Sequence, residues 1–155
     1  MASTLTASTM TVSISESITL NGKNQGGTTT KTFPSIAEIS KRISTITTTE
    51  ATILTFSAAV GQGTYIAASV RYMRFTNLDD TNFIMLTFKD EDNTECRVKV
   101  DAGQSFIFNA DNAGGLVDTM KANGSALASG LADLYDVTAD ADTASCDLEI
   151  FIASV

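Results

Sequence analysis

The sequence of 155 residues predicts an all-β protein, folded as an antiparallel β-sandwich or a jelly-roll-like barrel. Segments of alternating apolar and polar residues recur about every 10 to 12 residues, with turn residues between them. Threonine, which favours strands, is abundant, whereas proline occurs once. Because 43% of the residues are hydrophobic and 18% are charged, the chain is expected to form one folded domain.

The first alternating segment covers residues 10–20 and predicts a half-buried strand. Residues 1–9 are polar and uncharged, which predicts an N-terminal arm that becomes ordered against a neighbour. The β domain is then expected to span residues 10–155. Asn21 and Gly22 open a turn, and a glycine-rich loop follows.

The segment of residues 33–46 carries isoleucines at spacings of three and four, which is the period of a helix face. Isoleucine and threonine are nevertheless poor helix formers. We expect a short helix or an irregular turn near residues 35–42, followed by strands at 43–47 and 51–57.

The later strands are more regular. They are expected at residues 65–68, 70–76, 82–88, 95–100, 104–109 and 146–153. Residues 110–146 are rich in Ala, Gly and Asp, and predict one long excursion with a short helix or small strand around residues 126–134. Excursions of this length are usually functional or lie between subunits.

Acidic turns are the only candidates for a metal site. The segment 90–95 resembles a calcium loop in its clustered oxygens, but it lacks the glycine at the sixth position and the glutamate at the twelfth. An ordinary hairpin turn is the favoured interpretation. Asp140 and Asp142 form a similar pair, for which solvation is favoured over a metal between subunits. We therefore expect no metal and no cofactor.

The absence of histidine excludes Ser-His-Asp and Cys-His catalysis, and we expect no enzymatic activity. The net charge of −8 is uneven: residues 1–78 hold six basic and three acidic residues, and residues 79–155 hold four and fifteen. The acidic half disfavours nucleic-acid binding, whereas the basic half suits docking on an acidic neighbour such as a sister subunit. No signal peptide or membrane span is expected.

The two cysteines, Cys96 and Cys146, lie far apart in the sequence. Cys96 falls on the apolar side of its predicted strand, so two buried free thiols are expected, although a disulfide remains open. Nothing in their spacing resembles a metal knuckle.

Several predicted strands are apolar on both faces, whereas a lone sandwich should leave one face of each strand to water. The outward apolar residues indicate that part of the outer surface is covered, by the long excursion or by another subunit, and we favour an interface in a homo-oligomer. These residues are Phe83, Met85, Ile107 and Phe151.

The segments VRYMRFTNLDDTNFIMLTF (70–88), VKVDAGQSFIF (98–108) and LEIFIASV (148–155) have a recognisable order. SITLNG (17–22) and TILTF (52–56) fit the same layout. Together they resemble small all-β virion structural proteins of tailed bacteriophages, notably those that infect cyanobacteria. The resemblance implies a virion role in capsid decoration, head-to-tail connection or the tail.

From this resemblance we expect a cement protein, made in the host cytoplasm, that binds the major capsid protein lattice as a trimer or similar ring. The basic N-terminal half would face the shell. Two other hypotheses stay open: an adaptor or tail component, and a glycan-binding or host-adhesion module. The last would need exposed aromatic residues, for which only Tyr65, Tyr72 and Tyr135 are available beside phenylalanines expected to be buried.

Overall fold

A computed structural model describes residues 5–59, 61, 63–126 and 130–155 of the chain. It divides into two compact units, Met1–Ala37 and Glu38–Val155, which we call the arm and the body. The sequence places the boundary between arm and β domain after residue 9, whereas the structure places it after Ala37. The arm is longer because the strand expected within residues 10–20 pairs with residues of the same unit.

The all-β prediction is confirmed. Apart from one 3-10 helix (η1, Ala67–Ser69), every element of the described chain is a strand. The strands are β1 (Ser8–Ser15), β2 (Thr19–Leu20), β3 (Lys23–Asn24), β4 (Thr28–Ile36), β5 (Glu38–Ile46), β6 (Ala51–Ser57), β7 (Thr64–Ile66), β8 (Val70–Asn77), β9 (Ile84–Asp90), β10 (Glu95–Val100), β11 (Ser105–Asn109), β12 (Leu134–Ala141) and β13 (Cys146–Ser154).

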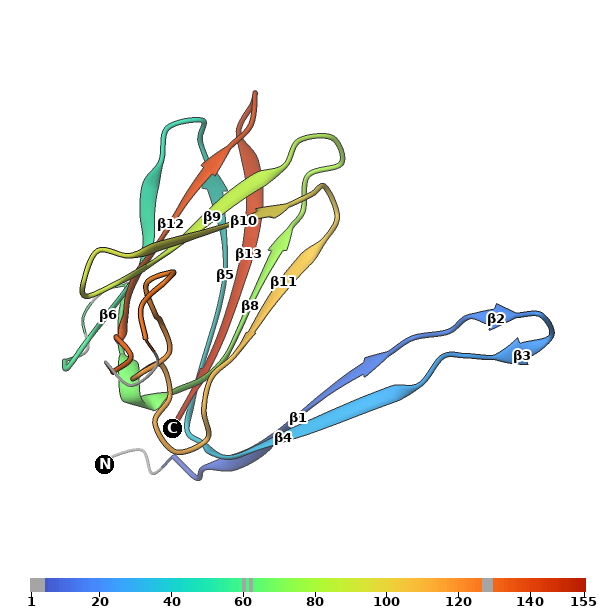
Figure 1. Cartoon of the computed structure of the whole chain (residues 1–155), viewed down its shortest axis with the longest axis horizontal. Coiled ribbons are helices and arrows are strands. Elements are labelled where there is room, and N and C mark those ends of the chain that lie inside the picture. Colours follow the sequence, from blue (N-terminus) through green and yellow to red (C-terminus); the bar gives the residue numbers. More distant parts are fainter. Residues whose placement is uncertain (1–4, 60, 62, 127–129) are drawn as a thin grey trace. The chain divides into compact units, whose positions relative to one another are not determined.

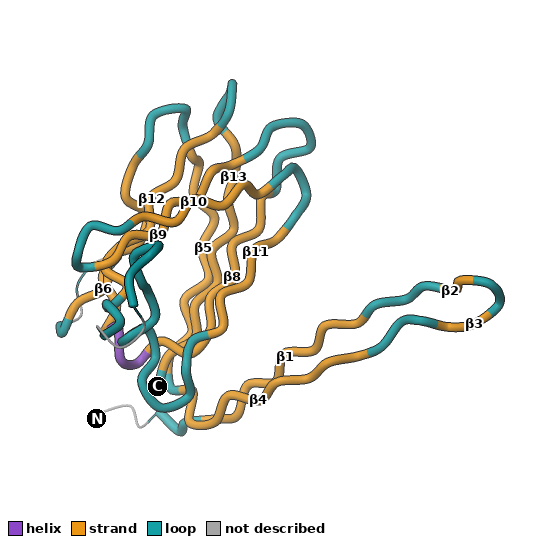
Figure 2. The backbone as a smooth tube through the Cα atoms, viewed as in Figure 1, coloured by secondary structure: helices purple, strands orange, loops and turns teal. Residues whose placement is uncertain are grey.

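The body is a sandwich of two sheets (Figures 1 and 2). One sheet has the strand order β10-β9-β12-β6-β7, and the other has the order β11-β8-β13-β5. Within these sheets the pairing is antiparallel, except between β6 and β7. We call the first the five-stranded sheet and the second the four-stranded sheet.

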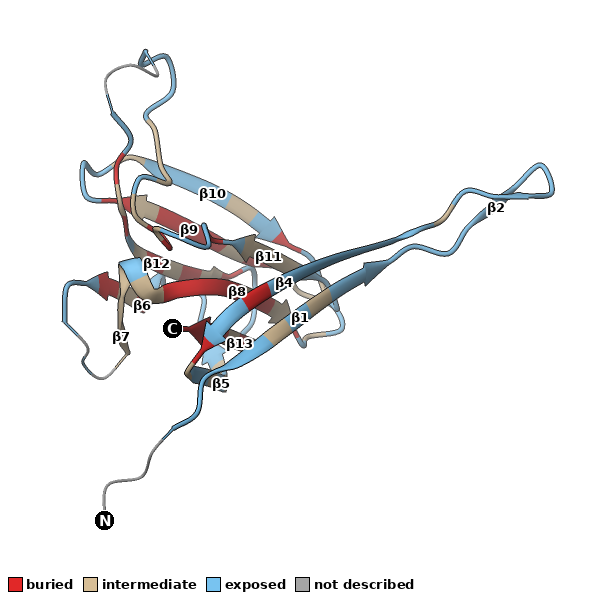
Figure 3. Ribbon diagram, turned by 90° about the horizontal axis from the view of Figure 1, so that it is seen from below, coloured by how far each residue is buried: buried red, intermediate tan, exposed pale blue. Residues whose placement is uncertain are grey.

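The core of the body lies between these sheets and follows the strand alternation. Phe75 of β8 meets Phe88 of β9 edge to face, with ring centroids 5.8 Å apart. Leu54, Leu86 and Ile150 are almost completely buried beside them. Each such side chain contributes about 1.5–3 kcal/mol when it leaves water. Figure 3 shows the contrast between buried β8 and β9 and the mostly exposed strands of the arm.

The arm is a long β-hairpin. β1 pairs with β4, and the ladder continues toward the tip through the Glu16 N–H, which donates to Gly27 O at 2.8 Å. β2 and β3 form the tip. Near the base, two residues of β4 (Pro34 and Ser35) oppose one residue of β1, which makes a β-bulge that accommodates proline.

The expected helix or irregular turn at residues 35–42 is wrong, because β4 and β5 occupy this segment. The helix-like spacing arises because the isoleucines do not all face one way. Ile39 and Ile43 point outward from β5, whereas Ile46 is buried in the core. An apolar pattern mixed over two faces of a strand imitates the period of a helix.

The expected excursion of residues 110–146 ends earlier than predicted. Residues 134–141 form β12, a central strand between β9 and β6. The expected element at residues 126–134 lies partly outside the described residues. The remaining excursion is attached to the body through buried Leu116, whose N–H donates to Ala67 O at 2.9 Å. A side chain at Gly115 would collide with the same carbonyl, so glycine is required there.

Candidate functional site

The four predicted interface residues are all half-buried, but they belong to different surfaces. Ile107 and Phe151 lie in register on either side of Arg74, across β11, β8 and β13. Phe83 and Met85 lie just before and within β9, in the other sheet. The structure therefore brings together two of the four residues and separates them from the other pair.

Ile107 and Phe151 are part of a larger surface on the outward side of the four-stranded sheet. Ile39 and Ile43 of edge strand β5 share that side and are 59% and 60% exposed. We call Ile39, Ile43, Ile107 and Phe151 the apolar outer face. The sequence analysis did not include these two isoleucines in the interface, because it placed Ile39 in a short helix or turn and Ile43 at the start of a strand. Both are β-branched strand residues with exposed side chains.

Charged side chains surround Phe151 on this face. The Glu149 carboxylate binds Arg74 at 2.5 Å and Lys41 at 3.1 Å. The Arg74 guanidinium lies 5.9 Å from the centroid of the Phe151 ring, and Tyr72 meets the same ring edge to face at 6.0 Å. Burial raises the pKa of Tyr72. Aromatic and arginine side chains of this kind are enriched at the centre of protein interfaces.

Phe83 and Met85 lie on a more ionic surface. Met85 stands directly between Lys99 and Asp140 on the neighbouring strands. Lys99 Nζ lies 4.6 Å from the centroid of the Phe83 ring. Arg97 on the same sheet reaches Asp140 at 3.0 Å. Charged neighbours cover part of these apolar side chains, so this surface leaves less apolar area for another protein to bury.

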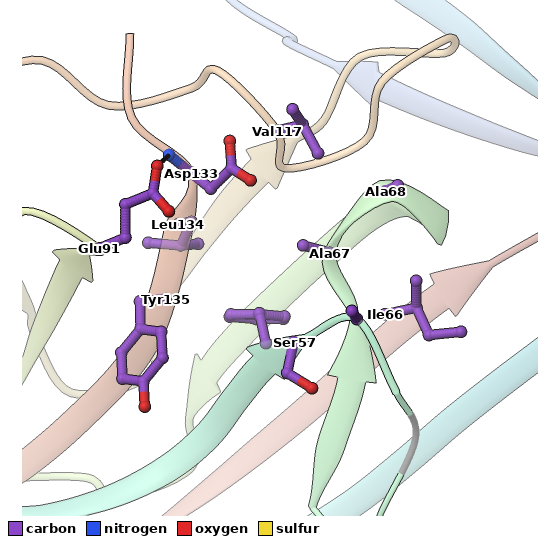
Figure 4. A pocket seen from close by; sticks show the side chains of 11 residues that line it. Ser57, Ile66, Ala67, Ala68, Glu91, Val117, Asp133, Leu134 and Tyr135 are labelled. Atoms are coloured by element: carbon purple, nitrogen blue, oxygen red, sulfur yellow. Dashed lines mark hydrogen bonds between the residues drawn. The ribbon is translucent and has the colours of Figure 1, made fainter.

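The body also contains a pocket of about 330 Å³ at the end of the sandwich that carries η1 (Figure 4). Its apolar lining comes from β6, β7, η1, the excursion and β12. The residues that supply it include Phe56, Ile66, Ala67, Val117 and Leu134.

Two carboxylates, Glu91 and Asp133, lie side by side at one wall of the pocket, facing Ile66 and Ala67 across it. The backbone fixes their positions, because the Glu91 N–H donates to Asp133 O at 3.1 Å. Tyr135, 49% exposed, completes that wall. The volume lies at the lower end of the range for ligand pockets and would hold one or two side chains. The pocket was not evident in the sequence because four distant segments build it.

The acidic segment 90–95 is a hairpin turn between β9 and β10, as favoured from the sequence. Buried Asp90 supports the turn, because its Oδ1 accepts the Thr94 N–H at 2.6 Å. Asp140, of the second acidic pair, is engaged by Arg97. Within the described ranges, no three His, Cys, Asp or Glu side chains are arranged to hold a metal ion, and no helix is long and apolar enough to span a membrane.

Both cysteines are free thiols, but only Cys146 is buried. The expectation that Cys96 is buried is wrong. Cys96 shares the inward side of Val98 and Val100, yet it lies near the start of β10, an edge strand that the core covers less fully. Burial raises the pKa of the Cys146 thiol, and the nearby Asp79 carboxylate raises it further.

No protein-family model matches the chain, and no curated protein or solved structure matches it either.

Proposed function

We propose that this chain is a capsid decoration protein of a tailed-phage virion, which stabilises the head by binding the major capsid protein as an oligomer. One observation carries the proposal: a sandwich body is joined to a two-stranded arm whose described residues contribute nothing to the hydrophobic core cluster and are buried only near its base, at Phe33 and Ile36. An isolated two-stranded hairpin is only marginally stable in water. A long hairpin of this kind is therefore best explained as a segment that binds a neighbouring protein.

The faces of the arm support this interpretation. On one face, the hydroxyl groups of Ser13 and Ser15 form hydrogen bonds with the threonine hydroxyl groups opposite, those of Thr30 and Thr28, at 3.2 and 3.1 Å. The other face carries Met10, Val12 and Ile14, of which Ile14 is 44% exposed. Apolar side chains of β1 on one side of the ladder, opposite Lys31 and Thr29 of β4, suit contact with the surface of another protein.

The apolar outer face supplies a second contact, which we assign to the capsid shell. Ile39 and Ile43 would lose their exposure when the capsid shell covers them. Modest contacts of this kind suffice on a capsid, since many linked copies bind together with higher avidity than one. The resemblance of residues 70–88, 98–108 and 148–155 to virion proteins supports the same role.

The test uses particles of the phage that encodes this chain, with its gene deleted. Purified protein should bind the heads saturably, in a copy number proportional to that of the major capsid protein, and should raise the temperature at which the heads break. Binding as a single small ring at the neck would overturn decoration in favour of an adaptor, and binding to the tail would favour a tail component.

Substitutions separate the shell contact from unspecific adsorption. Ile39→Asp and Ile43→Asp should each weaken head binding about tenfold or more, because they place a charge in the apolar outer face. Thr52→Asp is the matched control, since Thr52 is exposed on β6 of the other sheet. Equal binding by all three variants, or binding of the wild type to a glycan array instead of heads, would contradict the proposal.

A further inference from the structure

We propose that the tip of the arm of one copy docks in the pocket of a second copy, with Leu20 in the apolar part and Lys23 against Glu91 and Asp133. This inference rests on the proposed function only in assuming that the arm joins proteins. It names the partner of the arm as another copy of the same chain.

The tip presents an apolar and a cationic side chain together. Leu20 and Lys23 are directly opposite each other in the β2–β3 ladder, so they project from the same side. Asn21 and Gly22 between them both have positive φ, at 51° and 75°, as a tight two-residue hairpin turn requires. Leu20 is 55% exposed and Lys23 is exposed, so both groups are free to enter a partner.

The pocket offers the complementary pair of properties. Its apolar walls, including Ile66 and Leu134, suit an aliphatic side chain. The carboxylates of Glu91 and Asp133 stand on one wall, where the ammonium of Lys23 would meet them. The overall charges agree, because the arm holds Lys23 and Lys31 against one acid, whereas the body holds the remaining seventeen of eighteen acids.

The length of the arm favours docking of its tip in the pocket of a second copy over docking in the pocket of the same chain. The ladder between Lys23 and Ala37 covers fourteen residue steps, so an unbroken hairpin holds its tip about 45 Å from Ala37 at any angle between the units. The pocket begins close to the junction between arm and body, where Ala37 is followed by Glu38. Ser154 is in register with both Glu38 and Val70, and Ala67 and Ala68 at the pocket come three and two residues before Val70.

Ser154 belongs to β13, which lies between β5 and β8, so Glu38 of β5 and Val70 of β8 are about 10 Å apart. The near wall of the pocket therefore lies within about 20 Å of the junction between arm and body. An intact arm is too long to place its tip there in its own body. Since each copy carries one tip and one pocket, two copies can exchange arms as a symmetric pair, or several can join head to tail in a ring such as a trimer.

Disulfide trapping tests the contact between chains. Full-length chains of two tag sizes carry Cys96→Ser, and one adds Leu20→Cys while the other adds Ser57→Cys in the exposed rim of the pocket. Mixing under mild oxidation should give a disulfide-linked species of mixed tags. Thr143→Cys, exposed beyond the far end of β12, is the matched control and should give none.

Absence of the mixed species, equal trapping at Thr143→Cys, or a disulfide formed only within one chain carrying both Leu20→Cys and Ser57→Cys would overturn the proposal. The assay needs no phage particles, so its failure is distinguishable from failure of head binding.

A charge exchange gives an independent readout by sedimentation velocity. Asp133→Lys or Glu91→Lys should weaken self-association roughly tenfold, because repulsion replaces attraction at Lys23. Adding Lys23→Glu should restore it. Asp142→Lys makes the same charge change in the loop after β12 and should have little effect. Failure of Lys23→Glu to restore association would contradict the assigned pairing.

Discussion

At the residue scale, the side chain of Asn77 stabilises the turn at the end of β8, in the segment TNLDDTN. Its side chain is fully buried, and the Nδ2 group donates to Asn82 O at 2.8 Å and to Val100 O at 3.2 Å. Its Oδ1 accepts the Asp79 N–H at 3.0 Å. One amide thus joins the turn to the end of β10 and satisfies three backbone groups.

Replacing Asn77 with alanine should lower the free energy of unfolding by about 1–3 kcal/mol, because the Val100 carbonyl and its neighbours lose their buried partner. Urea denaturation of the full chain measures this. Asn112→Ala, in an exposed turn, is the control and should change stability little. An Asn77→Ala protein as stable as the wild type would mean that water replaces the amide.

Asp79 should make the fold sensitive to acid. The backbone N–H groups of Asn82 and Thr81 donate to its Oδ1 at 2.6 and 2.8 Å, and they lower its pKa below the usual 3.8. A lowered pKa in the folded state stabilises the fold above the unfolded pKa, and this contribution is lost as the pH falls through the folded pKa.

The melting temperature of the wild type should therefore fall more steeply than that of Asp79→Asn between about pH 5 and pH 3. Parallel curves for the two proteins over this range would show that the Asp79 charge does not stabilise the turn.

At the scale of elements, the arm and the body differ in what stabilises them. The hydrophobic core cluster contains only residues between Ile46 and Ile152, all of which belong to the body. The arm is instead a ladder whose apolar residues Ile14, Ile18 and Leu20 remain exposed. The body therefore has the means to fold alone, whereas the described part of the arm contributes no residue to this cluster.

A chain that lacks Met1–Ala37 should keep the far-ultraviolet circular dichroism of a β-protein and unfold cooperatively. The same truncation should abolish concentration-dependent self-association, which light scattering measures. A truncated body that is unfolded would contradict the division into units, and a truncated body that still associates would exclude the arm as the contact.

At the scale of the whole molecule, the two sheets present unlike outer surfaces. The four-stranded sheet exposes isoleucines around Phe151, whereas the five-stranded sheet surrounds Met85 with Lys99 and Asp140. Phe151 also has charged neighbours, Arg74 and Lys41, so the difference between the two surfaces lies in the exposed apolar area of Ile39 and Ile43 beside it. Loss of the aromatic ring from the first surface is therefore expected to weaken binding more than loss of the Met85 side chain from the second.

Phe151→Asp should weaken attachment to phage heads about tenfold or more, while Met85→Asp should weaken it by less than about threefold. Thermal melts of both variants establish that each is folded. If Met85→Asp has the larger effect, the capsid contact lies on the five-stranded sheet and the assignment of the apolar outer face is wrong.

Period-two alternation and turn residues were enough to predict the all-β class and most strands, because they are direct signs of a half-buried strand. The sequence also marked Ile107 and Phe151 as outward apolar residues. It misread residues 35–42, where isoleucines on two sides of a strand mimic a helix, and it ended the arm too early.

Only the tertiary structure decided which outward residues share a surface. Phe151 and Met85 look alike in sequence but lie on different sheets, since strand order depends on pairings between distant segments. The pocket also depends on contacts between distant segments, because β6, η1, the excursion and β12 meet only after the sheets have packed. Local patterns specify strands, whereas long-range pairing and packing specify the surfaces they build.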